Sequence, residues 1–390
     1  MMNSPPLRTF CWRTVHQTAI APRSRTASRI ARFAQCQRHF SSTRIHYEQQ
    51  KALVATEKPE ARTRNRRRII PGLFIISGLA TGLYFIAGPD SKTNTKIFDP
   101  PRFTPFTILK REEVSPSSII LTLRPQNFIN TPRAILSDPY QTSWDKGIWS
   151  VEIKQPQLQI ARSYTPLPPN TLDPTGTKCD LRLLIRKEHK GEVSGYLHNL
   201  TAGSQLHLRG PHEEFDIPES VTNVLFLAGG TGIAPALQVA YSLLGGRKED
   251  GEKPKMHIVW SSRKRAECEG GSDTSNPNVW EGRRTGRIVQ ELERLQQKYP
   301  GQLTVDYLVD EEKSVLDQKR ISSLIKANSE VKFGARHTRI DSKLLLVSGP
   351  EGFVDYVAGP KKWESGKEVQ GELGGLLGQM GIRTWKIWKL

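Results

Sequence analysis

The stretch ARSYTPLP, residues 161–168, has the residue types and spacing that a binding site for a flat, charged molecule needs. In a strand, residues two apart point the same way, so Arg162 and Tyr164 share one face and Ser163 and Thr165 share the other. A flavin needs an aromatic partner for its ring, a hydrogen bond at the ring edge and a cation for its pyrophosphate. Tyr164, Thr165 and Arg162 supply these three groups. An edge strand that ends in prolines is the alternative interpretation.

A second candidate, GEVSGYLHNL at 191–200, has the pattern of a helix start that binds phosphate. Backbone N–H groups at a helix N-terminus bind anions, and the Ser194 hydroxyl adds a further donor. Gly191 lets the backbone approach a ligand closely. Val193, Leu197 and Leu200 fall on one face of this predicted helix.

Two glycine-rich turns follow apolar runs, in LAGGTGIAP at 227–235 and in VSGPEGF at 347–353. Each has the order strand, glycine turn, helix, which is the position where parallel sheets bind nucleotides. The first turn lacks the G-x-G-x-x-G order of the usual dinucleotide motif. By itself, such a turn is weak evidence for a nucleotide site.

The elements that must position these motifs differ between two parts of the chain. Residues 98–217 contain short runs of alternating polarity separated by Pro, Gly and Asn, with one helical candidate, which predicts a small closed antiparallel barrel. Residues 219–390 alternate apolar strands with amphipathic helices, which predicts a parallel sheet covered on both faces. Within this second part, the Gly- and Ser-rich stretch 263–287 is long enough to be an insertion or a flap.

The N-terminal segment has a different composition. Residues 1–68 hold 15 of the 57 Lys and Arg and only three acidic residues, and no acidic residue precedes Glu48. An Arg- and Ser-rich, acid-poor segment is typical of a mitochondrial transit peptide, predicted here at 1–40. A basic segment at 41–68 then precedes 19 uncharged residues, 69–87, which predict one transmembrane helix. The basic flank orients that helix with 41–68 in the matrix and the C-terminal part in the intermembrane space.

The remaining charge and the cysteines limit the function further. Because most of the +18 net charge lies before residue 69, the folded part does not have the basic patch expected of a nucleic-acid binder. Cys179 and Cys268 lie far apart, no C-x-x-C is present, and no metal site is predicted. Two buried thiols are the preferred interpretation.

The ordered motifs R-x-Y-T-P, G-x-x-S, G-G-T-G-x-x-P and G-P-E-G-F resemble those of the ferredoxin–NADP reductase superfamily, with its cytochrome b5 reductase branch nearest. The resemblance covers about 98–390. It implies a six-stranded antiparallel FAD-binding barrel at 98–217 and an NAD(P)-binding α/β domain at 219–390. It also implies that Tyr164, Thr165 and Ser348 are catalytic. The implied cofactor-binding residues are Arg162, Ser163, Tyr164, Thr165, Arg186, Gly191, Val193, Ser194, Gly230, Thr231, Gly232, Pro235, Gly349, Pro350 and Phe353.

With its leader and span, the chain is similar to fungal mitochondrial flavoproteins of the inner membrane. That resemblance implies an FAD oxidoreductase that passes electrons from NADPH or NADH to haem or a haem protein and supports haem attachment to cytochrome c. The implied partners are haem, apocytochrome c and its haem lyase. A non-catalytic assembly or import factor with a structural flavin is the first alternative. A general NADH reductase like the cytochrome b5 reductases is the second.

Three features leave choices open. Ser348 stands where reductases of the superfamily usually have a cysteine beside the nicotinamide, which predicts slower hydride transfer or a less well placed nucleotide. The SSRKR stretch at 261–265 is either a site for a 2′-phosphate, favouring NADPH, or a solvated basic turn. Trp385 or Trp388 lies near the flavin, or both pack a final strand.

Overall fold

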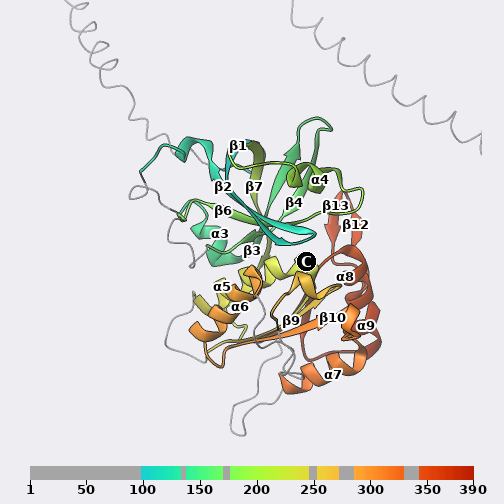
Figure 1. The fold of residues 1–390 in the computed structure, drawn as a ribbon. Coiled ribbons are helices and arrows are strands. Elements are labelled where there is room, and N and C mark those ends of the chain that lie inside the picture. The colour runs from blue at the N-terminus through green and yellow to red at the C-terminus, as the bar shows by residue number, and fades with distance from the viewer. Residues whose placement is uncertain (1–97, 133–137, 170–175, 246–252, 272–284, 329–341) are drawn as a thin grey trace, which may run out of the picture. The chain divides into compact units, whose positions relative to one another are not determined.

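The computed structural model describes residues 98–132, 138–169, 176–245, 253–271, 285–328 and 342–390. The predicted transit peptide, basic segment and transmembrane helix, residues 1–87, lie outside the described residues. Within the described ranges, no helix is long and apolar enough to cross a bilayer. Residues 92–390 belong to one unit, in which an antiparallel sheet lies beside a parallel sheet (Figure 1).

The antiparallel sheet contains seven strands in the order β4-β3-β7-β1-β2-β6-β5. In β7 buried and exposed side chains alternate, because one face of that strand packs on a core and the other meets solvent, whereas β6 is buried along nearly its whole length. Phe106, Trp149 and Leu206 lie in that core, fully buried. The strands are β1 Thr104–Ser115, β2 Ser118–Pro125, β3 Gly147–Gln155, β4 Ile160–Tyr164, β5 Pro166–Leu167, β6 Leu181–Arg186 and β7 Gln205–Asp216.

The sheet has seven strands where six were predicted. The segment around Thr165 forms two of them, β4 at one edge of the sheet and β5 at the other. Tyr164 pairs with Val151 of β3 at one end, and Pro166 pairs with Leu183 of β6 at the other end. Thr165 is the single residue between β4 and β5. This connection brings the two ends of the sheet together and curls it into the barrel form that the sequence predicts. Short helices α3, Gln141–Lys146, and α4, Glu192–His198, accompany the sheet, and α3 was not predicted.

The parallel sheet contains five strands in the order β10-β9-β8-β11-β14. The order reverses between β8 and β11, which makes the carboxyl ends of these two strands the point where ligands bind in open parallel sheets. The glycine turns at 229–232 and 349 follow these two ends. The strands are β8 Asn223–Gly229, β9 Lys255–Ser262, β10 Leu303–Val309, β11 Lys343–Ser348 and β14 Lys386–Lys389.

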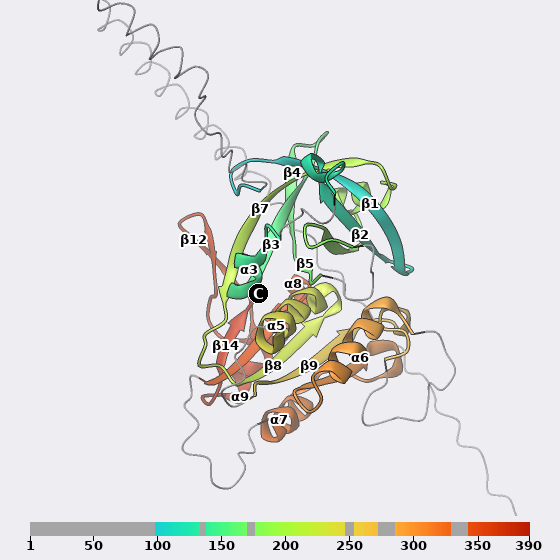
Figure 2. The ribbon, with the colours of Figure 1, turned by 90° about the vertical axis from the view of Figure 1, so that its left-hand side faces the viewer.

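Helices cover both faces of the parallel sheet, as predicted. Successive residues of a strand face opposite sides, so Val224 and Phe226 pack with α5 and α6 while Leu225 and Leu227 pack with α7, α8 and α9. Figure 2 shows α5 between the parallel sheet and the barrel, where it contacts both. The helices are α5 Ile233–Gly245, α6 Arg287–Lys298, α7 Gln318–Ala327, α8 Glu351–Ala358 and α9 Gly375–Met380.

At Lys389, a side chain forms hydrogen bonds with the outer edge of β14. The Gln370 amide accepts from the Lys389 N–H and donates to the Lys389 carbonyl, both at 2.7 Å. Buried Lys389 also donates from Nζ to the carbonyls of Pro360 and Glu372. An exposed hairpin precedes this region, formed by β12, Lys362–Glu364, and β13, Lys367–Val369, and neither strand was predicted.

Candidate functional site

The sequence motifs meet at a cleft of about 440 Å³ between the barrel and the carboxyl ends of β8 and β11. This volume is in the range of about 300–1,000 Å³ that is usual for small-molecule and cofactor sites. Five segments line the cleft: β4, the end of β6, the turn into α4, the turn into α5, and the end of β11. The predicted site residues that line it are Arg162, Ser163, Tyr164, Thr165, Arg186, Gly191, Val193, Ser194, Thr231, Gly232, Pro235, Ser348 and Gly349.

Three predicted site residues lie outside this lining. Gly230 lines a smaller pocket next to the cleft. Pro350 is the residue before the first turn of α8. The Phe353 ring lies against Gly229, where an added Cβ would come within 2.5 Å of it, so Phe353 packs the base of the turn.

The β4 segment presents a cation and an aromatic ring to the cleft. The Arg162 side chain is exposed, and among the described residues it donates to the neighbouring carbonyl of Ala161, at 2.8 Å. Its charge is therefore not neutralised by a described carboxylate and is available to an anion in the cleft. Tyr164 is partly buried, and this burial raises the pKa of its phenol to about 12. Tyr164 is thus a neutral ring at any physiological pH.

The turn before α4 is built around the Ser194 hydroxyl. Ser194 Oγ accepts from the Glu188 N–H and donates to the Gly191 carbonyl, both at 3.1 Å. Because this hydroxyl hydrogen is already used, the groups free to bind a phosphate here are the N–H groups of the first helical turn. Gly191 has no room for a side chain, since a Cβ would lie 2.5 Å from Ser194 Oγ.

The two glycine turns touch each other at the floor of the cleft. A Cβ on Gly232 would lie 2.2 Å from the carbonyl oxygen of Ser348, so only glycine lets these backbones approach so closely. Ser348 is 7% exposed and lies beside Ala228 in the sheet register. Ser348 is the last residue of β11, at the end of the sheet where the nicotinamide is predicted to bind.

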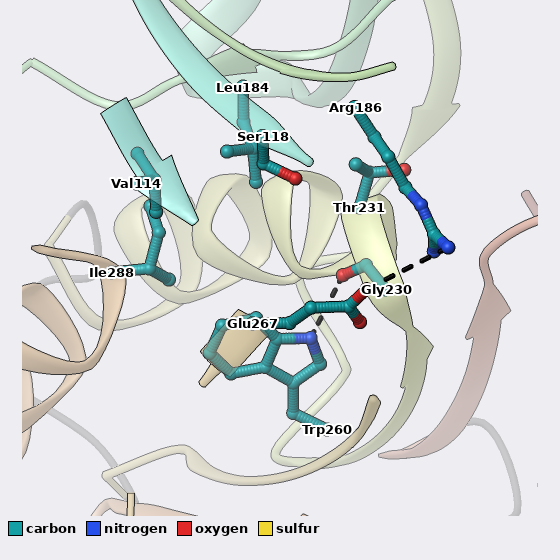
Figure 3. A pocket seen from close by; sticks show the side chains of 9 residues that line it. All are labelled: Val114, Ser118, Leu184, Arg186, Gly230, Thr231, Trp260, Glu267 and Ile288. Atoms are coloured by element: carbon teal, nitrogen blue, oxygen red, sulfur yellow. Dashed lines mark hydrogen bonds and ion pairs between the residues drawn. The ribbon is translucent and has the colours of Figure 1, made fainter. Parts of the chain in front are cut away.

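Arg186 also lines the smaller pocket, together with Trp260, Gly230 and Glu267 (Figure 3). Arg186, at the end of β6, lies 3.6 Å from Glu188 and 3.7 Å from Glu267, and Glu267 follows β9 in the parallel part. The Trp260 indole donates to the Gly230 carbonyl at 2.9 Å. Arg186 is therefore paired with carboxylates, unlike Arg162, and its ion pair with Glu267 joins the barrel to the segment that follows β9.

The structure also adds cleft residues that sequence reasoning missed. Ile160, Leu184 and Ala234 supply apolar lining, and Glu188, Lys190 and Glu192 supply charge. The charged residues adjoin Gly191, so extending the predicted turn by three residues on its N-terminal side would have found two of them. Leu184 has no such signal, because its side chain reads as ordinary barrel core.

In the Ser261–Arg265 stretch, Arg265 already forms an ion pair with another part of the chain. The Arg265 guanidinium bonds to the Glu312 carboxylate, at 2.7 Å for one contact, and to the Gly271 carbonyl at 2.6 Å. Arg263 and Lys264 remain exposed. If this turn contacts a 2′-phosphate, Arg263 and Lys264 are the candidate residues, and Arg265 is not.

The tryptophans and cysteines have structural positions. Trp385 is 4% exposed in the core below α7 to α9, and the Trp388 ring lies 5.1 Å from the Phe215 ring. Neither lines the cleft, so packing is the correct alternative. Cys179 and Cys268 are both free and buried, as predicted, and burial raises the pKa of both thiols.

The donor set of the cleft fits FAD. An unneutralised cation, a neutral aromatic ring and the first-turn N–H groups of α4 lie around one cleft, and Gly191 and Gly232 keep two backbone approaches clear. These are the groups that a pyrophosphate and a tricyclic ring require. Residues 148–217, which run from the second residue of β3 to the residue after β7, match the family model described as the oxidoreductase FAD-binding domain.

Comparison with known proteins finds relatives of the same kind. An uncharacterized FAD-binding protein of Schizosaccharomyces pombe is 27% identical over 75% of this chain and 86% of its own. An NADH-cytochrome b5 reductase 2 of Phaeosphaeria nodorum is 25% identical over 60% of this chain and 62% of its own. The cytochrome c mitochondrial import factor CYC2 of Saccharomyces cerevisiae is 23% identical over 86% of this chain and 95% of its own.

Among solved structures, the cytochrome b5 reductase domain of Ulva prolifera nitrate reductase aligns with a TM-score of 0.43 and 14% identity, over 67% of this chain and 92% of that domain. The matched family model and the named reductases support both predicted cofactors, FAD and a pyridine nucleotide. Residues 148–217 therefore match an oxidoreductase FAD-binding domain, and the chain is similar to cytochrome b5 reductases and to a cytochrome c import factor.

Proposed function

We propose that this protein is an FAD-dependent NAD(P)H oxidoreductase that delivers electrons to haem or a haem protein and so supports haem attachment to cytochrome c. The observation that carries the proposal is the single cleft that joins the β4 segment to the Gly232 and Ser348 turns. A ring against Tyr164 and a second ring above these turns would share that cleft. The haem partner and the role in cytochrome c maturation rest on what the relatives are named.

Each group has a separate task in this proposal. Arg162 and the first turn of α4 bind the pyrophosphate, and Tyr164 supports the flavin ring. Thr165 binds the ring edge with its hydroxyl. Gly232, Ser348 and Gly349 hold the nicotinamide end of the nucleotide. When bound, FAD supplies the redox chemistry, accepting a hydride from the nucleotide and releasing single electrons to an iron centre.

The proposed location is the mitochondrial inner membrane, with residues 69–87 as the single span and the flavin part in the intermembrane space. The sequence composition of 1–87 and the mitochondrial relative support this location. A tagged chain that resists carbonate extraction, and whose C-terminal tag becomes protease-sensitive when only the outer membrane is opened, would agree. Protection of that tag until the inner membrane is lysed would contradict the orientation.

The activity is tested by an anaerobic titration of the purified full-length chain loaded with FAD. Bleaching of the flavin absorbance near 450 nm by NADPH or NADH is the expected result, and the two nucleotides are compared at equal concentration. Addition of hemin or ferric cytochrome c to the bleached protein should restore the oxidised spectrum and reduce the iron. A preparation that binds no FAD would refute the proposal.

The second candidate is an assembly factor in which the flavin is structural. Ser348 favours this candidate, because a hydroxyl is smaller and less polarizable than the thiol expected there. A yellow protein that neither nucleotide reduces, and that still binds apocytochrome c or its haem lyase, would support it. Equal activity toward any cytochrome, with no defect in cytochrome c maturation on deletion, would support the general NADH reductase instead.

A further inference from the structure

Gln238, on α5, is fully buried and makes three hydrogen bonds to the backbone of the barrel. Its Oε1 accepts from the Trp149 N–H at 3.0 Å. Its Nε2 donates to the Trp149 carbonyl at 3.1 Å and to the Pro166 carbonyl at 2.9 Å. The orientation of the amide follows from chemistry, because the Trp149 N–H can only donate and the two carbonyls can only accept.

These bonds lie along the edge of β3 at Trp149, where a longer β4 would otherwise pair. The register that pairs Tyr164 with Val151 would, if continued, place Pro166 opposite Trp149. Pro166 instead pairs with Leu183 of β6, and a proline has no N–H to donate in any case. The Gln238 side chain fills the gap, since a primary amide presents the same donor and acceptor as a peptide group. Without it, the Trp149 N–H and two carbonyls would be buried without partners.

Gln238 also connects the two cofactor ends of the cleft. The nucleotide turn Gly230–Gly232 runs directly into α5, and Gln238 follows Gly232 by six residues. At 1.5 Å per residue, this separation is about 9 Å along one rigid helix. The helix therefore follows the Gly230–Gly232 turn at its start, and from its middle Gln238 bonds to Trp149 of β3 and to Pro166 at the start of β5.

We propose that Gln238 is a positioning residue that sets the course of the Tyr164–Pro166 segment and its placement relative to the nucleotide turn. This inference rests on the proposed function, since it assigns Gln238 a part in holding the flavin ring and the nicotinamide at reacting distance. A misplacement of about 1 Å between reacting groups can lower a rate by about 100-fold. Gln238 makes no contact with either ring in this proposal.

Gln238→Met tests the proposal, because methionine has a similar size and no amide. The full-length chain loaded with FAD should show an altered visible circular dichroism spectrum of the flavin. Reduction by the preferred nucleotide, followed by stopped flow, should slow by between about 10- and 100-fold. Amide hydrogen exchange at Trp149 should become faster by at least about tenfold, while exchange at Val151, which is paired with Tyr164, changes little.

Gln370→Met is the matched control. It removes the same kind of two-bond bridge, from Lys389 at the edge of β14, and it lies outside the cleft lining. It should lower stability without changing the flavin spectrum or the reduction rate. If Gln238→Met does not fold, Gln238→Glu provides the test, because a carboxyl buried against two carbonyls stays protonated. It keeps the side-chain volume, accepts from the Trp149 N–H and donates to one carbonyl, so it loses one of the three bonds.

Three results would overturn the positioning role of Gln238 or separate it from the proposed function. A Gln238→Met protein with the wild-type flavin spectrum and reduction rate would show that Gln238 only stabilises the fold. Equal changes in Gln370→Met would show that the effect is general loss of stability. If the wild-type flavin is not reduced by either nucleotide, the proposed function fails, and the spectrum and the Trp149 exchange rate still decide the positioning role.

Discussion

Arg182 and Glu291 form a two-bond ion pair between β6 of the barrel and α6 of the parallel part, with N···O distances of 2.5 and 3.2 Å. Their side chains are only 5% and 12% exposed. Because so little water reaches the pair, each charge depends on the other for its solvation. The two parts of the chain are thus joined by a contact that tolerates little separation.

Removal of one partner of this pair should destabilise the protein clearly. Arg182→Met leaves the Glu291 carboxylate with Arg287, 3.8 Å away, as a weaker partner. We expect a loss of about 3 kcal/mol in the free energy of unfolding, at the lower end for a broken buried pair. Urea unfolding measures it. Lys146→Met, which removes the exposed pair with Glu213, is the control and should change little; equal effects of the two changes would contradict the burial argument.

Arg162→Ala should weaken FAD binding. The substitution removes a cation that has no described carboxylate partner, so it costs no ion pair in the free protein. A charge-assisted hydrogen bond contributes about 1.5–3 kcal/mol, which corresponds to a rise in Kd of about 10- to 100-fold. Equilibrium dialysis with FAD measures the change.

Arg111→Ala is the control for Arg162→Ala, since Arg111 lies on β1 and pairs with Glu113, 3.2 Å away. It should leave the Kd for FAD unchanged. An unchanged Kd in Arg162→Ala as well would place the pyrophosphate elsewhere in the cleft.

Tyr164 should make stability fall at alkaline pH. Its folded pKa of about 12 lies above the value of about 10 for an unfolded tyrosine. Above pH 10 the unfolded chain loses this proton first, so stability is complete below pH 10 and is lost as the pH rises toward 12. Between pH 10 and 11 we expect the wild type to lose about 1 kcal/mol more than Tyr164→Phe.

Urea titrations of both proteins without FAD, at pH 9, 10 and 11, measure this difference. The other buried tyrosines contribute equally to both proteins and cancel. Parallel curves for the two proteins would show that the Tyr164 phenol ionises as freely in the folded chain as in the unfolded one.

Gly232→Ala should impair nucleotide-dependent reduction of the flavin. The new methyl would lie 2.2 Å from the Ser348 carbonyl oxygen, so the two turns must move apart. We expect the reduction rate to fall by at least about tenfold while FAD remains bound. Gly352→Ala is the control, because its methyl meets nothing within 4 Å and its helical position gains about 0.5–1 kcal/mol from alanine. A normal rate in Gly232→Ala would show that the turns can separate without cost.

Much of this arrangement follows from local sequence patterns. The strand ends at Tyr164 and Ser348 are predictable because polarity alternates along the first strand and apolar residues fill the second. The glycine turns are predictable because only glycine allows such approaches. Thirteen of the predicted site residues consequently line one cleft.

The contacts that depend on distant segments are not predictable in this way. Nothing near Gln238 in the sequence shows that a strand will end opposite it, and its helix reads as an ordinary apolar one. Ser194 looked like a phosphate donor because the sequence does not show that its hydroxyl donates to the Gly191 carbonyl and accepts from the Glu188 N–H. Arg265 looked free for the same reason, since its partner Glu312 is 47 residues further along the chain.

The Gln370 amide on the edge of β14 has a consequence for solubility. An open sheet edge is a template on which another polypeptide can add a strand, and this is a common start of aggregation. Here the outward-facing backbone groups of Lys389 are already occupied by a side chain of the same molecule. The backbone of Lys389 is therefore not available to pair with a strand of a neighbouring copy.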